Sequence, residues 1–124
     1  MDALRILVVD DEEEICSVTK SFLTKRNFTV FTASNGADAL TLAKKESPQL
    51  ALLDLRLGSE SGIDILAKIK EIDKKIKVIM VTGLGDDESI RQALSAGADD
   101  YITKPFTAAY LSDVINQKLN KGGA

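Results

Sequence analysis

Short apolar runs alternate along this chain with stretches in which apolar residues recur at helical spacing. Runs rich in aliphatic and β-branched residues predict strands, and we expect five of them, at residues 4–9, 28–32, 50–53, 77–81 and 101–103. The amphipathic stretches predict five helices, one after each strand. This alternation is typical of an α/β fold, in which helices cover both faces of a parallel sheet.

Capping residues indicate where the helices begin. Ser34 or Asn35 can cap the second helix, which we expect over about residues 36–46. Ser61 followed by Asp64 resembles a capping box at the start of the third helix. We further expect the first helix to close at Lys25 and Arg26, a loop at residues 56–60, a fourth helix from Asp86 or Asp87 to Gly97, and a fifth helix after Phe106.

The composition is that of one ordinary globular domain. The chain has 124 residues, of which 44% are hydrophobic and 28% charged, so a single sizeable core is possible. The formal net charge of −3 gives no reason to expect a surface for nucleic acid or an anionic membrane. No apolar stretch approaches the roughly 20 residues that span a bilayer, and the first apolar run is too short for a signal peptide.

The numbers of cysteine and histidine residues limit the catalytic and metal-binding chemistry that this chain can carry out. The single cysteine, Cys16, cannot form an internal disulfide, which fits a cytoplasmic protein. Cys16 lies in a helical pattern, and we expect it to pack quietly rather than react. The chain contains no histidine, which excludes Ser-His-Asp and Cys-His catalysis and the commonest zinc sites.

Chemistry-bearing residues stand where four of the predicted strands end. Asp10 and Asp11 follow the first strand, Asp54 the third, Thr82 the fourth and Lys104 the fifth. Parallel strands with right-handed crossovers place these ends at one edge of the sheet, where such folds bind ligands. Two carboxylates about 4 Å apart repel by roughly 4 kcal/mol at an effective dielectric near 20, so water or a cation must relieve them.

The residue types at this edge suit a hard cation and a phosphoryl group. Oxygen ligands without His or Cys select Mg²⁺, Mn²⁺ or Ca²⁺. A carboxylate beside such an ion can act as a nucleophile and form an aspartyl-phosphate. Lys104 can pair with one phosphoryl oxygen and Thr82 can donate to another. Taken singly, each residue also fits a plain turn or cap, but their joint arrival at one edge favours a site.

These residues carry a family resemblance. The chain resembles the CheY-like receiver domains of bacterial two-component response regulators over nearly its whole length. The resemblance implies a flavodoxin-like, doubly wound sheet of five parallel strands in the order 2-1-3-4-5, with residues 1–121 as the receiver domain and 122–124 as a tail or the start of a linker. The matching segments are residues 6–12, 50–54, 78–82 and 97–106.

The resemblance also implies roles at the acidic edge. Asp54 would accept a phosphoryl group from the phosphohistidine of a sensor histidine kinase or a phosphotransfer protein. Asp11, Asp54 and the backbone carbonyl of Arg56 would bind Mg²⁺, for which Mn²⁺ can substitute, and Asp10 would act mostly through water. The domain would catalyse its own phosphorylation and dephosphorylation without being a turnover enzyme.

Phosphorylation is expected to act as a switch. Lys104 and Thr82 would hold the phosphoryl oxygens, and Tyr101 would turn inward as Thr82 moves, although Tyr101 also reads as an ordinary edge-strand residue. The Lys104–Pro105 bond is expected to be cis. The face of the fourth helix, fifth strand and fifth helix would then be rebuilt for an effector domain or a downstream protein, with exposed residues that include Arg91, Gln92, Ser95 and Gln117.

Other readings of the chain remain open. An aspartyl-phosphate-type phosphatase would share the chemistry, but it usually needs two Asp separated by one residue, where this chain has Asp10 and Glu12. A receiver that is never phosphorylated could serve only as an interaction module. We expect no direct contact with nucleic acid or membrane, and either a monomer or a phosphorylation-dependent dimer.

The chain departs from the family at three positions. Gly58 stands where the family usually has a proline, four residues after the phosphoacceptor, and we expect it to loosen the loop. The two positions that tune hydrolysis hold Arg56 and Leu84, neither of which is an acid or amide suited to orienting a water. We therefore expect a long-lived aspartyl-phosphate.

Substitution of Leu84 tests this expectation. Leu84→Glu should shorten the lifetime of the phosphorylated protein, because a carboxylate there can orient the attacking water. The measurement is the decay of phosphorylated protein after removal of the phosphodonor. A lifetime equal to that of the wild type would contradict the idea.

Overall fold

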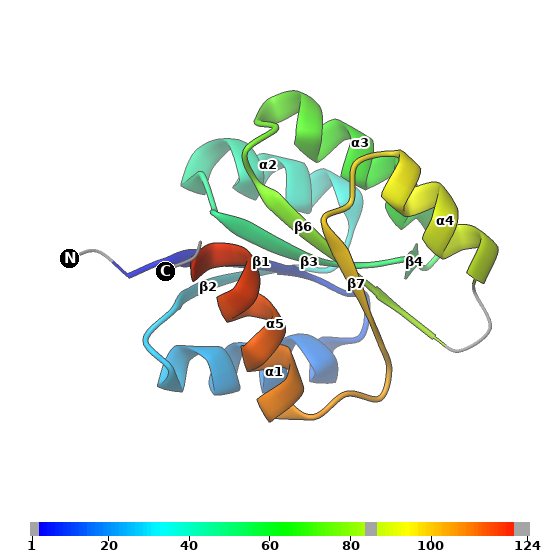
Figure 1. Cartoon of the computed structure of the whole chain (residues 1–124). Coiled ribbons are helices and arrows are strands. Elements are labelled where there is room, and N and C mark those ends of the chain that lie inside the picture. The colour runs from blue at the N-terminus through cyan, green and yellow to red at the C-terminus, as the bar shows by residue number, and fades with distance from the viewer. Residues whose placement is uncertain (1–2, 84–86, 121–124) are drawn as a thin grey trace.

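Five parallel strands form the central sheet, as the alternating apolar runs predict (Figure 1). The computed structural model describes residues 3–83 and 87–120. The order across the sheet is β2-β1-β3-β6-β7, which confirms the expected order 2-1-3-4-5 of the main strands. Their bounds are β1 Arg5–Val9, β2 Thr29–Ala33, β3 Leu50–Asp54, β6 Lys77–Thr82 and β7 Asp100–Thr103.

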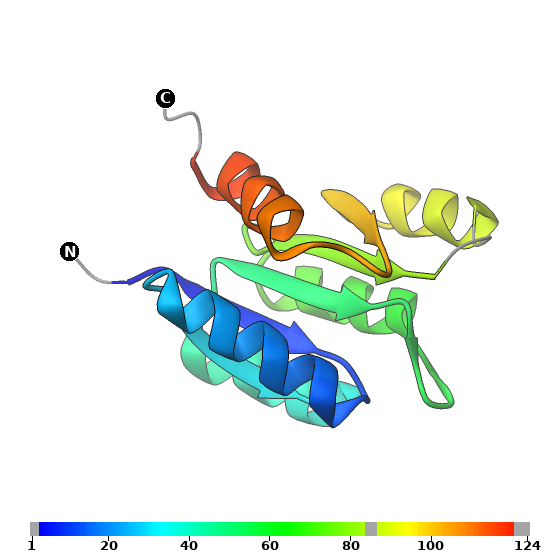
Figure 2. The same ribbon diagram turned by 90° about the horizontal axis from the view of Figure 1, so that it is seen from below.

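Helices cover both faces of this sheet. Two of them, α1 (Glu13–Lys25) and α5 (Ala108–Asn120), lie on one face. The other face carries α2 (Gly36–Glu46), α3 (Gly62–Ile72) and α4 (Asp87–Ser95), and Figure 2 shows the layers from a second side. No helix in the described ranges is long and apolar enough to cross a membrane. The alternative start at Asp86 and the expected tail at 122–124 lie outside the described residues.

Alternate residues of the strands supply two aliphatic cores. On β1, Leu7 and Val9 pack in the cluster that includes α2 and α3, whereas Ile6 and Val8 pack in the cluster that includes α1 and α5. Because neighbouring residues of a strand point to opposite faces, a sheet buried on both sides requires apolar residues in succession. Full burial of each such side chain contributes about 1.5–3 kcal/mol, so these strands hold the sheet edge in place.

Two of the predicted helix caps are present. The Asn35 side-chain oxygen accepts the Asp38 N–H at 2.8 Å, so Asn35 rather than Ser34 caps α2. The Ser61 hydroxyl caps α3, but it accepts the Ile63 N–H at 3.2 Å and not the Asp64 N–H that the predicted capping box would use. Each cap satisfies an N–H group that has no partner within its own helix.

The predicted loop at residues 56–60 is wrong. A small antiparallel hairpin occupies this stretch, formed by β4 (Arg56–Leu57) and β5 (Glu60–Ser61). Gly58 has φ 59° and makes the tight turn, a conformation that suits glycine and that proline, locked near −65°, cannot adopt. Leu57 is buried against the core and anchors the hairpin. Two-residue strands are too short to leave a periodic signal in the sequence.

The start of α3 allows a test of how tightly the sheet edge is packed. A Cβ on Gly62 would fall onto the carbonyl oxygen of Asp54 and lie 2.9 Å from the Leu55 Cα. Gly62→Ala should therefore lower the free energy of unfolding by about 2–3 kcal/mol, because backbone atoms cannot yield as a flexible side chain can. Urea unfolding followed by circular dichroism measures this loss.

Gly83→Ala is the matched control. No described atom lies within 4 Å of the position that its Cβ would take. The free energy of unfolding should be unchanged or slightly higher in this variant. An equal loss in both variants would contradict the packing explanation.

Candidate functional site

The register of the strands brings the candidate residues to one edge of the sheet. Val9 pairs with Leu53, so the residues that follow them, Asp10 and Asp54, come side by side. Asp54 in turn pairs with Val81, and Thr82 pairs with Thr103. The Lys104 N–H then donates to the Thr82 carbonyl at 2.8 Å. Residues far apart in the chain are thus joined by backbone hydrogen bonds before any side chain is considered.

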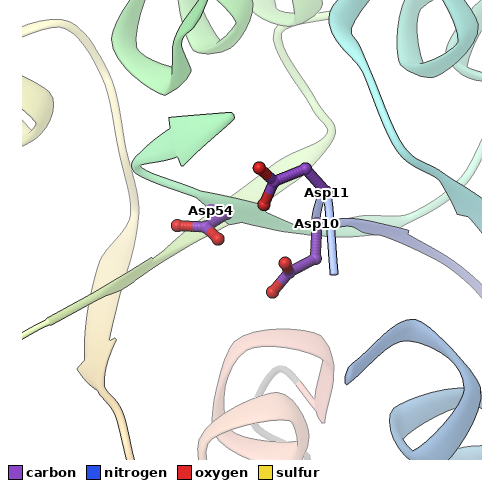
Figure 3. Close-up of side chains that lie close together, drawn as sticks. All are labelled: Asp10, Asp11 and Asp54. Carbon is purple, nitrogen blue, oxygen red and sulfur yellow. The ribbon is translucent and has the colours of Figure 1, made fainter. Parts of the chain in front are cut away.

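Three carboxylates gather at this edge. One carboxylate oxygen from each of Asp10, Asp11 and Asp54 lies within 4.8 Å of the others. Asp10 is 3% exposed and Asp54 8% exposed, whereas Asp11 is open to solvent. Figure 3 shows the Asp11 carboxylate above and the Asp10 carboxylate below the end of β1, both on the side of Asp54, which lies at the end of β3.

Lys104 bridges the two buried carboxylates. Its Nζ lies 3.1 Å from Asp10 Oδ2 and 3.1 Å from Asp54 Oδ2. Each of the three follows, two positions on, a strand residue packed in the cluster of α1 and α5, so all three are expected on that side of the sheet. Glu12, which is exposed, also approaches Lys104, at 3.6 Å.

Backbone groups hold the carboxylates in place. The Arg56 N–H donates to Asp54 Oδ1 at 3.2 Å, and the Glu12 N–H donates to Asp10 Oδ1 at 2.9 Å. The Cys16 thiol donates to the Asp10 carbonyl at 3.3 Å. Burial raises the pKa of this thiol, and the Asp10 charge raises it further, which agrees with the expected unreactive role.

The pKa values of Asp54 and Lys104, at the centre of the site, are both raised. Burial raises the pKa of Asp54 above its ordinary value, and the charge of Asp10 acts in the same direction, although the Arg56 N–H and Lys104 oppose both. Burial alone would lower the pKa of Lys104, but hydrogen bonds to Asp54 and Asp10 outweigh it and raise that pKa. The ammonium is therefore held firmly charged between two acids.

Among the described residues, acidic side chains outnumber basic ones around Lys104. The carboxylates of Asp10, Asp11 and Asp54 have oxygens within 4.8 Å of one another, and two such charges repel by about 3 kcal/mol at an effective dielectric of about 20. Lys104 reaches Asp10 and Asp54. A site made of carboxylate oxygens, without nitrogen or sulfur ligands, fits Mg²⁺ or Mn²⁺.

The remaining candidates differ in their surroundings. Thr82 is 1% exposed, and its hydroxyl donates to the Gly83 carbonyl at 3.1 Å. Tyr101, on the edge strand β7, is 39% exposed, so its ring is turned outward here.

The Lys104–Pro105 bond is cis, as expected. Leu84 lies outside the described residues. Arg91, Gln92, Ser95 and Gln117 are all exposed on α4 and α5.

The sequence did not reveal three contacts around the site. Glu12 precedes α1, which begins at Glu13, and its carboxylate lies 3.6 Å from Lys104. The thiol bond from Cys16 to Asp10 has no sequence signal, since it depends on where α1 packs. Glu60 falls in the predicted loop at residues 56–60, but its carboxylate accepts the Gly36 N–H at the start of α2.

Comparisons with known proteins agree on one family. A family model described as the response regulator receiver domain matches residues 6–116. Chemotaxis protein CheY of Bacillus subtilis (strain 168) is 39% identical over 119 residues, which cover 95% of this chain and 99% of that protein. Sporulation initiation phosphotransferase F of the same organism is 35% identical over 115 residues, 93% of each protein. A crystal structure of a CheY-like receiver domain protein from Methanospirillum hungatei JF-1 has a TM-score of 0.93 at 35% identity, covering 97% of this chain and 96% of that one.

Removing one charge from the crowded edge should stabilise the fold. In the absence of divalent metal at neutral pH, we expect Asp54→Asn to raise the free energy of unfolding by about 1–2 kcal/mol, because a buried and repelled charge is lost while Lys104 keeps Asp10. Urea unfolding in the presence of a chelator measures the change. Asp113→Asn, at an exposed position of α5, is the control and should change little.

The same variant has a pH signature. Since the pKa of Asp54 is raised by burial, the native state binds this proton more tightly than the unfolded chain does. The destabilising contribution of Asp54 is therefore absent at acidic pH and grows as the pH rises through the native pKa. A difference between variant and wild type that stays constant with pH would contradict this assignment.

Proposed function

Because the chain belongs to the family of response regulator receiver domains, we propose that it is the phosphoacceptor domain of a two-component system, with Asp54 as the residue that receives the phosphoryl group. Receiver domains are signalling modules rather than turnover enzymes. In the proposed step an Asp54 carboxylate oxygen forms a bond to phosphorus. The P–N bond of a donor phosphohistidine breaks, its electron pair returns to the imidazole nitrogen, and that nitrogen takes a proton from water.

The observation that carries this proposal is the setting of Asp54. Its carboxylate lies at the carboxyl end of the central strand β3, beside Asp10 and within hydrogen-bond distance of Lys104. The main chain also fixes it, through the Arg56 N–H. A held carboxylate next to a cation and further acids is the arrangement that covalent phosphoryl transfer to an acid requires.

A divalent cation fits the same place. We propose that Asp11, Asp54 and the Arg56 carbonyl bind Mg²⁺ directly and that Asp10 acts mostly through water; the three carboxylates offer oxygens within 4.8 Å of one another. When bound, such an ion offsets negative charge on the phosphoryl oxygens. Mn²⁺ is expected to substitute, since it accepts the same ligands.

Lys104 and Thr82 are proposed to hold the phosphoryl group. Lys104 already spans Asp10 and Asp54, so its ammonium needs little movement to reach an oxygen bound to Asp54. Thr82 would exchange its bond to the Gly83 carbonyl for a phosphoryl oxygen, and Tyr101 would turn inward behind it. Moving such an equilibrium from mostly off to mostly on takes about 5 kcal/mol of differential stabilisation.

The surface beside the site supports approach by a protein donor. An apolar hollow borders Lys104, and Val18 at its rim is 63% exposed. We propose that a sensor histidine kinase or phosphotransfer protein docks here, which would bring its phosphohistidine to Asp54. The hollow is lined by Ile15, Val18, Thr19, Lys104, Pro105 and Phe106.

We propose that the exposed face of α4, β7 and α5 is the surface that passes the signal on. It would contact an effector domain or a downstream protein in the cytoplasm. The protein would act as a monomer or as a dimer formed on phosphorylation. Direct contact with nucleic acid or membrane is not part of the proposal.

Intact-protein mass spectrometry tests the phosphoacceptor. After incubation with Mg²⁺ and acetyl phosphate, the wild type should gain the mass of one phosphoryl group, and Asp54→Ala should gain none, because the proposed phosphoacceptor carboxylate is missing from this variant. Addition of a chelator should suppress the gain in the wild type.

Two outcomes would contradict the proposal. A mass gain in Asp54→Ala equal to that of the wild type would remove Asp54 from its role. Steady turnover of a phosphomonoester by the wild type would favour a phosphatase instead. Asp113→Ala, which removes an exposed carboxylate on α5, should be phosphorylated as the wild type is.

A further inference from the structure

Glu60 connects the β4–β5 hairpin to helix α2. Its Oε1 accepts the N–H of Gly36 at 2.9 Å, across 24 residues of sequence. Gly36 is the first residue of α2, and its N–H is one of those that have no partner within the helix. A carboxylate is also favoured at this end of a helix by the helix dipole. The contact is therefore a helix cap supplied by a distant segment.

Close packing of three elements makes this contact possible. A Cβ on Gly36 would lie 2.7 Å from Glu60 Oε2 and would clash with the side chain of Ile65 on α3. With glycine at this position, the Glu60 and Ile65 side chains both pack directly against the start of α2. Glu60 thus ties the hairpin to a junction that belongs to the rigid body of the fold.

The hairpin in turn forms one wall of the acidic edge. The Arg56 N–H, at the start of β4, donates to Asp54 Oδ1. At the turn, a Cβ on Gly58 would lie 3.8 Å from Asp11 Oδ2. Leu57 pairs with Glu60 across the hairpin, and Arg56 pairs with Ser61. A displacement of Glu60 would therefore be passed to the backbone beside both Asp54 and Asp11.

The hairpin needs such an anchor because its turn contains Gly58, at a position where the family usually has the rigid ring of a proline. Gly58 at φ 59° loses more conformational entropy on ordering than another residue would. The buried Leu57 side chain restrains one strand of the hairpin, and Glu60 restrains the other.

We propose that Glu60 is a positioning residue of the site: its hydrogen bond to Gly36 holds the hairpin, and with it the Arg56 backbone, in the place that binds the metal and receives the phosphoryl group. This inference rests on the proposed function. It assigns Glu60 no contact with the phosphoryl group and no role in the chemical step.

The test compares variants that separate the hydrogen bond from charge and from helix stability. Glu60→Met keeps the length of the side chain but removes the acceptor. Glu60→Gln removes the charge and keeps the acceptor. Asn35→Ala weakens the same end of α2, by removing the cap on the Asp38 N–H, without touching the hairpin. If Glu60→Met fails to fold, Glu60→Ala takes its place.

Two quantities are measured for each folded variant. Isothermal titration calorimetry gives the dissociation constant for Mg²⁺, and mass spectrometry gives the rate of phosphorylation by acetyl phosphate. We expect Glu60→Met to raise the dissociation constant about tenfold, the lower end for groups that orient metal ligands, and to slow phosphorylation. Glu60→Gln and Asn35→Ala should stay close to the wild type in both quantities.

The outcomes distinguish this inference from the proposed function. A wild type that neither binds Mg²⁺ nor gains a phosphoryl group overturns the proposed function itself. A normal wild type with an equally normal Glu60→Met variant overturns the positioning role alone. Equal losses in Glu60→Met and Glu60→Gln would assign the effect to charge, and equal losses in Glu60→Met and Asn35→Ala would assign it to the stability of α2. Either result overturns the inference.

Discussion

Repulsion among acids at the end of the central strands is the constraint on which the site depends. Asp10 and Asp54 are buried next to each other, and Asp11 lies within 4.8 Å of them. The ammonium of Lys104 lies between the two buried carboxylates. A fold selected for stability alone would place apolar residues at such positions. The retained negative charge makes the edge receptive to a cation, and stability is lost in return.

The sheet withstands this repulsion because its aliphatic core is continuous on both faces. The residues that precede the acids, Val9 and Leu53, are buried, and their strands pair at four successive positions that end with these two residues. The acids therefore cannot move apart without breaking the register of the central strands. Because the strands form a rigid scaffold, the side chains at their ends are held in a defined position.

Much of this arrangement follows from the sequence, for a physical reason. The alternation of side chains between the two faces of a strand and the parallel pairing of the strands decide which residues share a side. The convergence of Asp10, Asp54 and Lys104 can therefore be predicted from their places after apolar runs. The β4–β5 hairpin and the contact of Glu60 with Gly36 cannot be predicted from the sequence pattern in this way. They depend on a glycine conformation and on the packing of α2 against α3, which no local pattern encodes. The contact of Glu12 with Lys104 depends likewise on the position of Glu12 just before α1, at the N-cap.

The difference in burial between Asp10 and Asp11 has a consequence for how an ion would enter and leave the site. Lys104 shields the inner half of the acidic edge, while the Asp11 carboxylate faces water. A cation that binds as proposed would thus reach the acids from the solvent-exposed side of Asp11, without first displacing Lys104. Its arrival and departure would change the charge beside Asp54, while the hydrogen bond from Lys104 keeps that carboxylate in place.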